Sequence, residues 1–321
     1  MHSCSTNLYD GRLTLQLMTR HKYSVTWRAE WSLWVEKAMI RKVVLPAAGL
    51  GTRLLPITKE LPKEMLPIFV RGHNGQRCLK PVLQAIFEQL HEAAFNDFCF
   101  VVGREKRAIE DHFTPDLGYL DRLRARLKIE CFENVKKFYD AIANSTIVWV
   151  NQPKPRGFGN SVLMTETFVG DSPFLCHAGD TYIVSKGNQH LKMLMKLFQE
   201  KDPDAVFLAQ RVKNPRSHGI VEGVKVAARL YEVRQVAEKP QRPRSNLAIM
   251  PLYIFDSQIF KALKKIKPGV DGEYQLTDGI QRLIDSGSKV YALELGPRDL
   301  HLDVGTPETY WEALHLSHTC L

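Results

Sequence analysis

The sequence predicts an α/β fold with a mainly parallel, mixed central sheet and helices on both of its faces. Apolar runs of the kind that form buried strands lie at 41–45, 97–102, 146–150, 173–177 and 204–210. Helical periodicity separates several of these runs, and strands that alternate with helices favour a parallel sheet covered on both sides. Ligands of such sheets bind at the carboxyl ends of the strands, so polar segments that come after a strand are the candidates for a site.

The first strand leads into a loop that contains Gly49 and Gly51. Glycines at this place allow backbone N–H groups to close around a phosphate, because no Cβ blocks the approach. Arg53 and Lys63 bring two positive charges to the same loop. This combination suits a nucleoside triphosphate, while a plain tight turn is the alternative.

Two common phosphate loops do not fit this segment. A P-loop needs Gly-Lys-Ser or Gly-Lys-Thr at its end, and Gly51 is followed by Thr52 and Arg53. A dinucleotide-binding loop needs a third glycine where Leu54 stands, and Pro56 prevents a long helix from starting directly afterwards.

The later elements come in chain order. The clearest helix is predicted at 80–94, where apolar residues recur at the period of one buried face. From 217 to 255, short strands separated by charged and Pro-rich turns predict a small antiparallel insertion. Near the end, Thr306 is expected as the N-cap and Pro307 as a first-turn residue of a last helix.

The glycine loop and the two segments after it resemble the signature of a known family. Ala48-Gly-Leu-Gly-Thr-Arg-Leu-Leu-Pro56, Thr58-Lys59 and Pro62-Lys-Glu-Met-Leu-Pro67 are similar to the signature of the nucleotidyltransferases that make nucleotide sugars, in particular the UTP:glucose-1-phosphate uridylyltransferases. The related thymidylyltransferases usually carry Lys-Gln-Leu-Leu-Pro at the last of these segments, which favours the uridylyl branch. Further matches run from residue 40 to residue 316 in family order and include Ala178-Gly-Asp180, Glu238-Lys-Pro240 and Leu302-Asp-Val-Gly-Thr-Pro307.

The resemblance implies a nucleotide-diphospho-sugar transferase (Rossmann-like) fold, with the antiparallel insertion on the sugar side. It also implies transfer of UMP from UTP to glucose 1-phosphate, with Mg²⁺ as cofactor. The alternatives are a dTTP:glucose-1-phosphate thymidylyltransferase, a UTP:N-acetylglucosamine-1-phosphate uridylyltransferase, and an inactive regulatory protein that binds sugar nucleotides.

The expected catalytic residues are cations and a carboxylate. Arg53 is expected to hold the β- and γ-phosphates, and Lys63 to lie nearer the α-phosphate, although each could be a solvated surface cation. Asp180 and Asp303 each end a strand-like run, and two carboxylates plus substrate phosphates are what Mg²⁺ prefers. Asp303 has the alternative role of a turn or cap residue, and in the uridylyl branch the metal contact of this second carboxylate stays open.

The other expected site residues recognise the two substrates. On the nucleotide side they are Ala48, Gly49, Gly51, Thr52, Gln152 and Gly157, with the Gln152 amide facing one edge of uracil. On the sugar-phosphate side they are Gly179, Gly219, Glu238, Lys239, Asn246, Ile249 and Tyr253. Lys239 would bind the phosphate unless it forms a structural ion pair, and Ile249 and Tyr253 could equally be core residues.

Composition sets the remaining expectations. The chain has 321 residues, a formal charge of +9 and 44% hydrophobic residues, which is typical of a globular protein. Its basic residues are scattered, so we expect anionic small substrates rather than nucleic acid as the partners. Six cysteines without C-x-x-C spacing and no apolar run of 18 residues predict a cytoplasmic protein with reduced thiols and no membrane span.

The expected domain organisation is simple. Residues 1–38 hold three tryptophans and precede the first strand, so they are expected to be an N-terminal extension. Residues 39–321 are expected to form a single nucleotidyltransferase domain, with a nucleotide-binding half (39–210) and a sugar-binding and C-terminal half (211–321). A homo-oligomer is expected.

Overall fold

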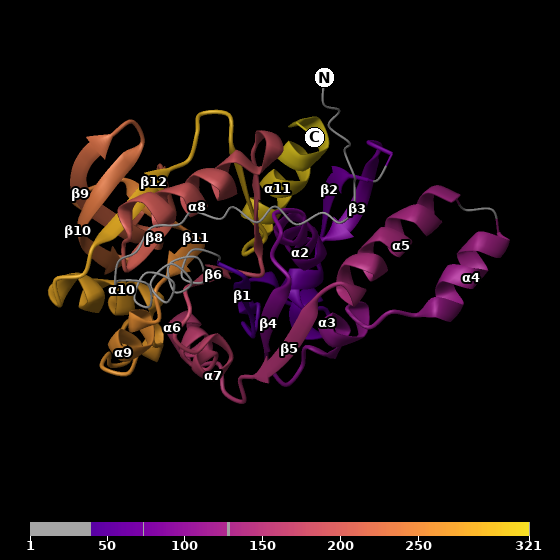
Figure 1. The fold of residues 1–321 in the computed structure, drawn as a ribbon, viewed down its shortest axis with the longest axis horizontal. Helices are drawn as coiled ribbons and strands as arrows, with labels where there is room; N and C mark the ends of the chain where they lie inside the picture. The colour runs from indigo at the N-terminus through magenta and orange to yellow at the C-terminus, as the bar shows by residue number, and fades with distance from the viewer. Residues whose placement is uncertain (1–39, 73, 127–128, 321) are drawn as a thin grey trace, which may run out of the picture. The chain divides into compact units, whose positions relative to one another are not determined.

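Nine strands form the central sheet of the computed structural model, which describes residues 40–320 apart from 73, 127 and 128 (Figure 1). The expected extension at 1–38 lies outside the described residues. The sheet order is β5-β4-β1-β6-β11-β8-β12-β10-β9. Its strands are β1 (Lys42–Ala47), β4 (Asp97–Val102), β5 (Thr146–Asn151), β6 (Phe174–His177), β8 (Ala205–Arg211), β9 (Gly219–Ala227), β10 (Leu230–Glu238), β11 (Leu247–Phe255) and β12 (Val290–Glu294).

The sheet is mixed, as the sequence predicts. Strands β5, β4, β1 and β6 are mutually parallel, and so are β8 and β12. β11 runs antiparallel to both β6 and β8, and thus joins the two parallel groups. All five strand-like runs named from the sequence are strands of this sheet.

The predicted antiparallel insertion consists of β9, β10 and β11, and it is continuous with the central sheet. β9 also pairs with β11 through Ile220 and Ala248, so the pairings from β11 through β8, β12, β10 and β9 return to β11. The second half of the sheet is therefore strongly curved. The antiparallel pairing of β9 with β10 makes Gly219, at the start of β9, the neighbour of Glu238, at the end of β10.

Helices cover both faces of the sheet because successive strand residues point to opposite sides. Val43 and Leu45 of β1 lie in one apolar cluster with α2 and α8, whereas Val44 lies in a second with α6, α9 and α10. The helices are α2 (Val82–Glu92), α3 (Arg107–His112), α4 (Leu117–Ala125), α5 (Ile129–Ala143), α6 (Phe158–Leu163), α7 (Glu166–Val169), α8 (Gln189–Lys201), α9 (Gln258–Leu263), α10 (Leu276–Asp285) and α11 (Pro307–Cys320). The helix expected at 80–94 is α2. No helix among the described residues is long and apolar enough to cross a membrane.

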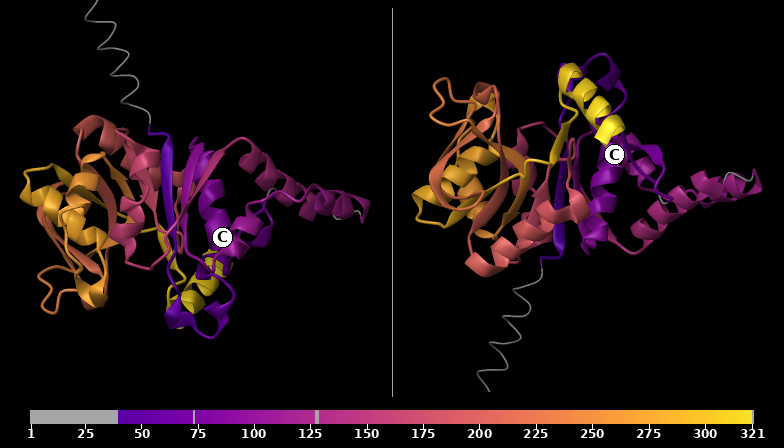
Figure 2. Two further views of the ribbon diagram at one scale, coloured as in Figure 1. Left: turned by 90° about the horizontal axis from the view of Figure 1, so that it is seen from below. Right: turned by 90° about the horizontal axis from the view of Figure 1, so that it is seen from above.

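Two small sheets lie beside the central one. β2 (Pro67–Arg71) pairs with β3 (Arg77–Pro81), and β7 (Thr181–Val184) pairs antiparallel with β13 (Leu300–Asp303). The β7–β13 ribbon begins directly after β6 and aligns Thr181 with Asp303. Helices α4 and α5 pack against each other and project from the body (Figure 2).

Candidate active site

The glycine loop after β1 approaches the side chain of Lys63. Gly51 adopts the left-handed conformation, with φ 67°, and its carbonyl accepts a hydrogen bond from Thr58 Oγ1 at 2.8 Å. A Cβ on Gly49 would lie 3.6 Å from Lys63 Nζ. The backbone beside Ala48 and Gly49 therefore faces the ammonium group, and Thr52 and Arg53 continue from it as the short 3₁₀ helix η1 (Thr52–Leu54).

Lys63 forms the central ion pair of the site with Asp180. Lys63 lies in the 3₁₀ helix η3 (Lys63–Met65), which follows the glycine loop in the chain. Its Nζ donates a hydrogen bond to Asp180 Oδ2. Burial alone would lower the pKa of Lys63, but the charges of Asp180 and Glu64 outweigh burial and raise it. Burial likewise opposes ionisation of Asp180, yet Lys63 holds the pKa of this carboxyl below its usual range. Both groups are therefore charged at neutral pH.

Asp303 joins the site through the β7–β13 ladder. A Cβ on Gly305 would lie 3.0 Å both from Arg53 Nη2 and from Asp303 Oδ1, so the guanidinium group and this carboxylate flank the same point. Burial, and then the charge of Asp180, raise the pKa of Asp303. Two carboxylates that disfavour each other's charge form a place where a cation is stabilised.

The predicted cap of the last helix is confirmed. Thr306 Oγ1 accepts a hydrogen bond of 3.2 Å from the backbone N–H of Thr309, and α11 starts at Pro307. Asp303 Oδ1 accepts a bond of 3.0 Å from Gly305 N–H. Asp303 thus stabilises the turn that precedes α11.

A second ion pair, not predicted from the sequence, lies next to the first. Lys106 Nζ lies 2.9 Å from Glu64 Oε2, with 8% and 2% of the two side chains exposed. Burial raises the pKa of Glu64, while Lys106 and Lys63 oppose this rise. Each residue lies in a segment that resembles the family, but no signal in the sequence connects the two. The pair fixes η3, and hence Lys63, to the loop after β4.

Gln152 and Gly157 lie in the connection between β5 and α6. Gln152 Nε2 donates to Asn160 Oδ1 at 2.8 Å, and its Oε1 accepts from Ser161 Oγ at 3.0 Å. Gly157 has φ 97°, and a Cβ there would lie 2.9 Å from Tyr274 O. The loop is thus held closely against the segment before α10, and the amide of Gln152 is oriented by α6.

Three of the expected sugar-side residues lie together. A Cβ on Gly219 would lie 3.1 Å from Glu238 Oε2 and 3.3 Å from Ile249 Cδ1. Thr277 Oγ1 donates a hydrogen bond of 2.7 Å to the same Glu238 oxygen. Gly179, by contrast, lies deep beside β1, where its N–H donates to Pro46 O at 3.0 Å.

The other three residues expected on the sugar-phosphate side have contacts elsewhere. Lys239 Nζ lies 3.2 Å from Asp271 Oδ2 at an exposed position. Asn246 Oδ1 accepts a bond of 2.7 Å from Arg211 Nη1. Tyr253 packs among aromatic rings of the core, with its ring centroid 5.3 Å from that of Phe255. The structure therefore groups Gly219, Glu238 and Ile249, while Tyr253 has the contacts of a core residue.

A cationic loop after β1, with one carboxylate after β6 (Asp180) and a second at the end of β13 (Asp303), is typical of an enzyme that binds polyphosphates. Residues 42–319 match the family model described as nucleotidyl transferase, and the chain belongs to this family.

The chain is similar both to relatives found by sequence and to solved structures. The chain is 40% identical over 248 residues to the UTP–glucose-1-phosphate uridylyltransferase of Bacillus subtilis (strain 168), which covers 76% of this chain and 80% of that protein. A solved UDP-glucose pyrophosphorylase complexed with UDP-glucose superposes with a TM-score of 0.75 at 30% identity, covering 88% of this chain and 100% of that chain. A UTP-bound UGPase from Acinetobacter baumannii gives a TM-score of 0.74 at 25% identity, covering 88% and 95%.

Proposed function

We propose that the chain transfers UMP from UTP to glucose 1-phosphate and releases pyrophosphate, with UDP-glucose as the product. The observation that carries the proposal is the convergence of Lys63, Arg53, Asp180 and Asp303 on one point beside the glycine loop. The names of the similar proteins support this choice of substrates.

The reaction needs little proton transfer, because the attacking phosphate oxygen of glucose 1-phosphate is already ionised near neutral pH. The barrier comes from repulsion between two polyanions and from charge on the leaving pyrophosphate. Lys63, charged and next to Gly49, would neutralise the α-phosphate, and Arg53 would bind the departing phosphates. Before substrate binds, Asp180 holds the Lys63 ammonium group in place.

The two carboxylates fit a divalent cation, and we propose Mg²⁺. No group of three or more His, Cys, Asp or Glu side chains that could hold a metal occurs in the part of the chain that the structure describes. Asp180 and Asp303 would therefore share the ion with substrate phosphate oxygens, which is usual for Mg²⁺. When bound, the ion would stabilise the negative charge on the phosphates during the transfer.

The substrates would be recognised on opposite sides of this point. We assign the uracil edge to Gln152, with backbone groups at Gly49 and Gly157, and the sugar hydroxyls to Glu238. Lys239 would have to leave Asp271 to bind the sugar phosphate, and the exposure of this ion pair makes the exchange cost little. Asn246 would have to leave Arg211 to join Glu238 at the sugar hydroxyls.

A coupled assay of pyrophosphate release tests the proposal. UTP, dTTP, ATP and GTP are each combined with glucose 1-phosphate, N-acetylglucosamine 1-phosphate and galactose 1-phosphate. The UTP and glucose 1-phosphate pair should give the highest kcat/KM. A higher value with dTTP or with the N-acetylated sugar would move the chain to one of those alternatives, and no release with any pair would support an inactive binding protein.

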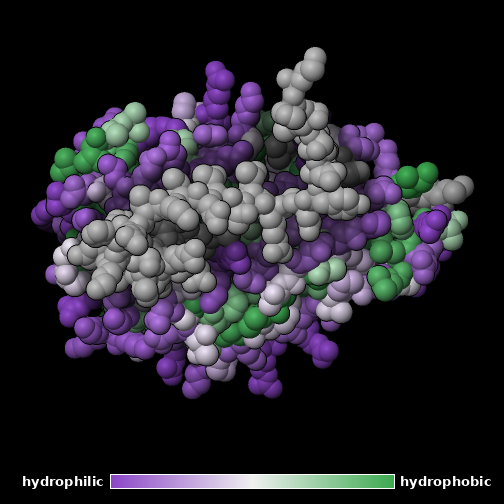
Figure 3. All heavy atoms as spheres, viewed as in Figure 1, coloured by the Kyte–Doolittle hydropathy of each residue, from purple (hydrophilic) through white to green (hydrophobic). Residues whose placement is uncertain are grey.

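We also propose that the chain forms a homo-oligomer. The α4–α5 end carries an apolar surface patch, visible in Figure 3, that includes Leu117, Tyr119 and Ile129, of which 68%, 43% and 66% are exposed. Covering such a patch is favourable in proportion to its apolar area. Light scattering coupled to gel filtration should give a multiple of the 36.7 kDa chain mass, and a monomer would contradict the proposal.

We propose a cytoplasmic location, supported by the buried thiols Cys99 and Cys176, neither of which forms a disulfide with another described residue. Burial raises the pKa of the Cys99 thiol to about 12, so the reduced form is inert there. Cell fractionation should find the chain with soluble marker enzymes, and recovery with membranes would contradict the assignment.

A further inference from the structure

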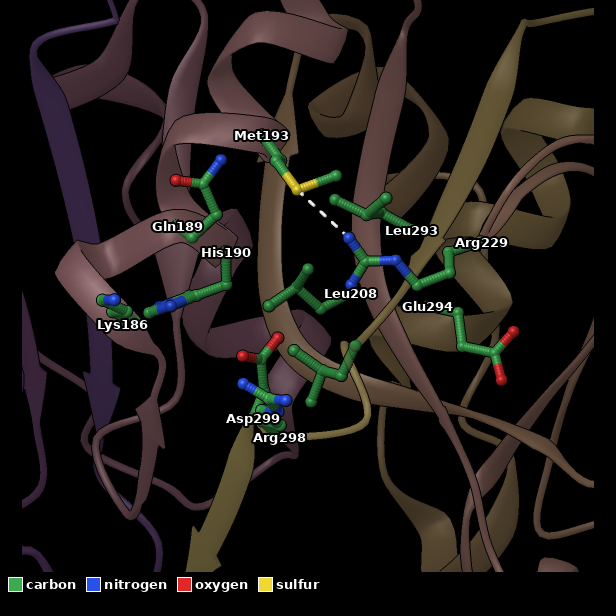
Figure 4. Close-up of a pocket in the computed structure, with 11 residues that line it drawn as sticks. Lys186, Gln189, His190, Met193, Leu208, Arg229, Leu293, Glu294, Arg298 and Asp299 are labelled. Atoms are coloured by element: carbon green, nitrogen blue, oxygen red, sulfur yellow. Dashed lines mark hydrogen bonds between the residues drawn. The ribbon is translucent and has the colours of Figure 1, made fainter. Parts of the chain in front are cut away.

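A second cavity lies away from the proposed catalytic point. It has a volume of about 290 Å³ and is formed by α8, the turn before it, β8, the turn between β9 and β10, the end of β12 and the loop before β13 (Figure 4). None of the residues expected at the catalytic site lines it. Its size is near the lower end of the range for small-molecule sites.

Three cations line this cavity without a carboxylate partner. Lys186, Arg229 and Arg298 form no ion pair with any residue that the structure describes. The half-buried guanidinium group of Arg229 has, in the described part of the chain, one hydrogen-bond acceptor, the Met193 sulfur at 3.3 Å. A thioether is a weak acceptor, so most of the hydrogen-bonding capacity of Arg229 is unused.

Two carboxylates also line the cavity. Glu294 Oε1 lies 3.2 Å from Nε of Arg211, a residue outside the lining, and Glu294 Oε2 accepts a hydrogen bond of 2.9 Å from Tyr231 Oη. Asp299 Oδ2 accepts a bond of 2.8 Å from Gly296 N–H, and a Cβ on Gly296 would lie 2.9 Å from this oxygen and 2.8 Å from Arg229 Nη1. Three cations therefore face the single unpaired carboxylate of Asp299, and the cavity keeps a net positive charge.

The lining also includes apolar side chains. Leu208, Leu293 and Leu295 line the cavity together with Met193, and burial lowers the pKa of His190 to about 3, so this imidazole is neutral. A ligand that fits this mixed lining has an anionic head and an apolar or ring-shaped body. Guanidinium groups bind phosphate through charge-assisted hydrogen bonds, which fits such a head.

We propose that this cavity is a regulatory site for a small phosphate monoester that carries a ring. The coupling arises from the ribbon of β7 and β13. Asp180 precedes β7 and Asp303 ends β13, so both lie at one end of the ribbon. At the opposite end, β7 leads into Lys186, and Arg298 precedes β13. The ends are about 10 Å apart, because three steps of about 3.3 Å separate the first and last of four residues. A ligand that draws the two cations together therefore acts on the spacing of the carboxylates.

Phenyl phosphate is a suitable probe, because it has the head and ring without a nucleotide or sugar. Calorimetric titration of the full chain at fixed ionic strength should show binding that is at least about fivefold tighter than that of inorganic phosphate. Arg229→Gln and Arg298→Gln should each weaken phenyl phosphate binding about tenfold or more, because each removes a charge-assisted contact. Arg298 is exposed, so its replacement leaves the fold intact.

Two matched variants locate the probe. Arg234 lies on β10 and pairs with Glu232 at 2.9 Å outside the cavity, so Arg234→Gln should bind within twofold of wild type. Lys239→Met should also bind normally, because Lys239 belongs to the proposed sugar-phosphate site. Loss of binding in the Lys239 variant, or wild-type binding in the Arg229 and Arg298 variants, would overturn the proposal.

The regulatory part rests on the proposed function and has its own readout. Phenyl phosphate should change the apparent Mg²⁺ requirement of pyrophosphate release at least about twofold in the wild type and not in Arg298→Gln. Tight binding with an unchanged Mg²⁺ requirement would overturn regulation. A chain with no transferase activity would refute the proposed function instead, and calorimetry would still decide whether the cavity binds the probe.

Discussion

At the scale of the residue, Lys63 is the cation whose position the structure defines most closely. It contacts Asp180 on one side, and its charge is supported by Glu64 from the neighbouring position. Lys59, four residues earlier in the same signature, has 77% of its side chain exposed and pairs with Glu60 at 3.5 Å. Lys63 is therefore a preorganised charge, whereas Lys59 is a solvated one.

We expect Lys63→Ala to lower kcat about 100-fold or more, because removal of one preorganised charge contact typically costs that much. Lys59→Ala, the matched control, should stay within threefold of wild type. Steady-state pyrophosphate release measures both. Near-normal turnover of the Lys63 variant would remove this lysine from the catalytic assignment.

The two carboxylates should respond to pH with opposite signs. The pKa of Asp180 is lowered by Lys63, so Asp180 stabilises the fold above its unfolded-state pKa and loses this contribution as pH falls through the folded value. The pKa of Asp303 is raised by burial and by Asp180, so ionised Asp303 destabilises the fold as pH rises through its folded value.

In metal-free buffer at pH 7, Asp180→Asn should therefore lower the Tm by about 4 °C, and Asp303→Asn should raise it by about 2 °C, for changes on the order of 1 kcal/mol. The gain from Asp303→Asn should vanish in acid, where the wild-type carboxyl is also protonated. Both variants should lose Mg²⁺-dependent activity. If thermal scans show both variants destabilised at pH 7, the proposed repulsion between the carboxylates is wrong.

At the scale of the element, the ion pair of Glu64 and Lys106 joins η3 to the loop after β4. Both side chains are almost fully buried. Removing one partner leaves the other charge without compensation in a site of low polarity, whereas an exposed pair contributes little.

Lys106→Met should lower the free energy of unfolding by about 3 to 5 kcal/mol. Lys137→Met breaks a pair with Glu92 of the same 2.9 Å length whose side chains are 53% exposed, and should cost under about 1 kcal/mol. The double change Glu64→Met with Lys106→Met should recover more than half of the loss. Urea unfolding measures all three, and equal effects of the Lys106 and Lys137 changes would contradict this role.

The β5–α6 connection depends on the close approach of Gly157 to the segment before α10. Gly157→Ala would place a Cβ 2.7 Å from Glu273 Cβ as well as against Tyr274, at a positive φ. Gly287 has φ 86° with no atom within 4 Å of such a Cβ, so Gly287→Ala adds the backbone strain alone. We expect about 1 kcal/mol of destabilisation for Gly287→Ala and about 1 to 3 kcal/mol more for Gly157→Ala. Calorimetric UTP binding should weaken in the Gly157 variant alone, and equal effects would show that close approach is unimportant.

At the scale of the whole molecule, the strands were predictable because their signals are local, and the candidate site residues were named from segments next to such strands. β4 is apolar from residue 98 to residue 102, and Asp180 comes three positions after the end of the buried strand β6. The pairing of Glu64 with Lys106 was not predictable, because 42 residues separate them and only the packed fold brings them together. The same holds for Asn246 and Arg211, 35 residues apart.

The division of residues 39–321 into a nucleotide-binding half and a sugar-binding half stays a prediction. Residues 40–321 cluster as one compact unit, and β11 joins strands of both halves. If the reaction takes place where the two halves meet, each substrate keeps its own phosphorus atoms. The α-phosphorus of UTP then exchanges its bond to the leaving pyrophosphate for a bond to an oxygen of the sugar phosphate.

The most direct test of the account traces ¹⁸O from glucose 1-phosphate labelled at its non-ester phosphate oxygens. If the sugar phosphate attacks the α-phosphate of UTP, UDP-glucose carries the label in its β-phosphate and in the oxygen that bridges the two phosphorus atoms. The ³¹P NMR signals of both product phosphates should then shift relative to unlabelled product, and pyrophosphate should contain no label. Label released as inorganic phosphate, or an unshifted α-phosphate signal, would show that a glucosyl group rather than UMP is transferred and would contradict the central claim.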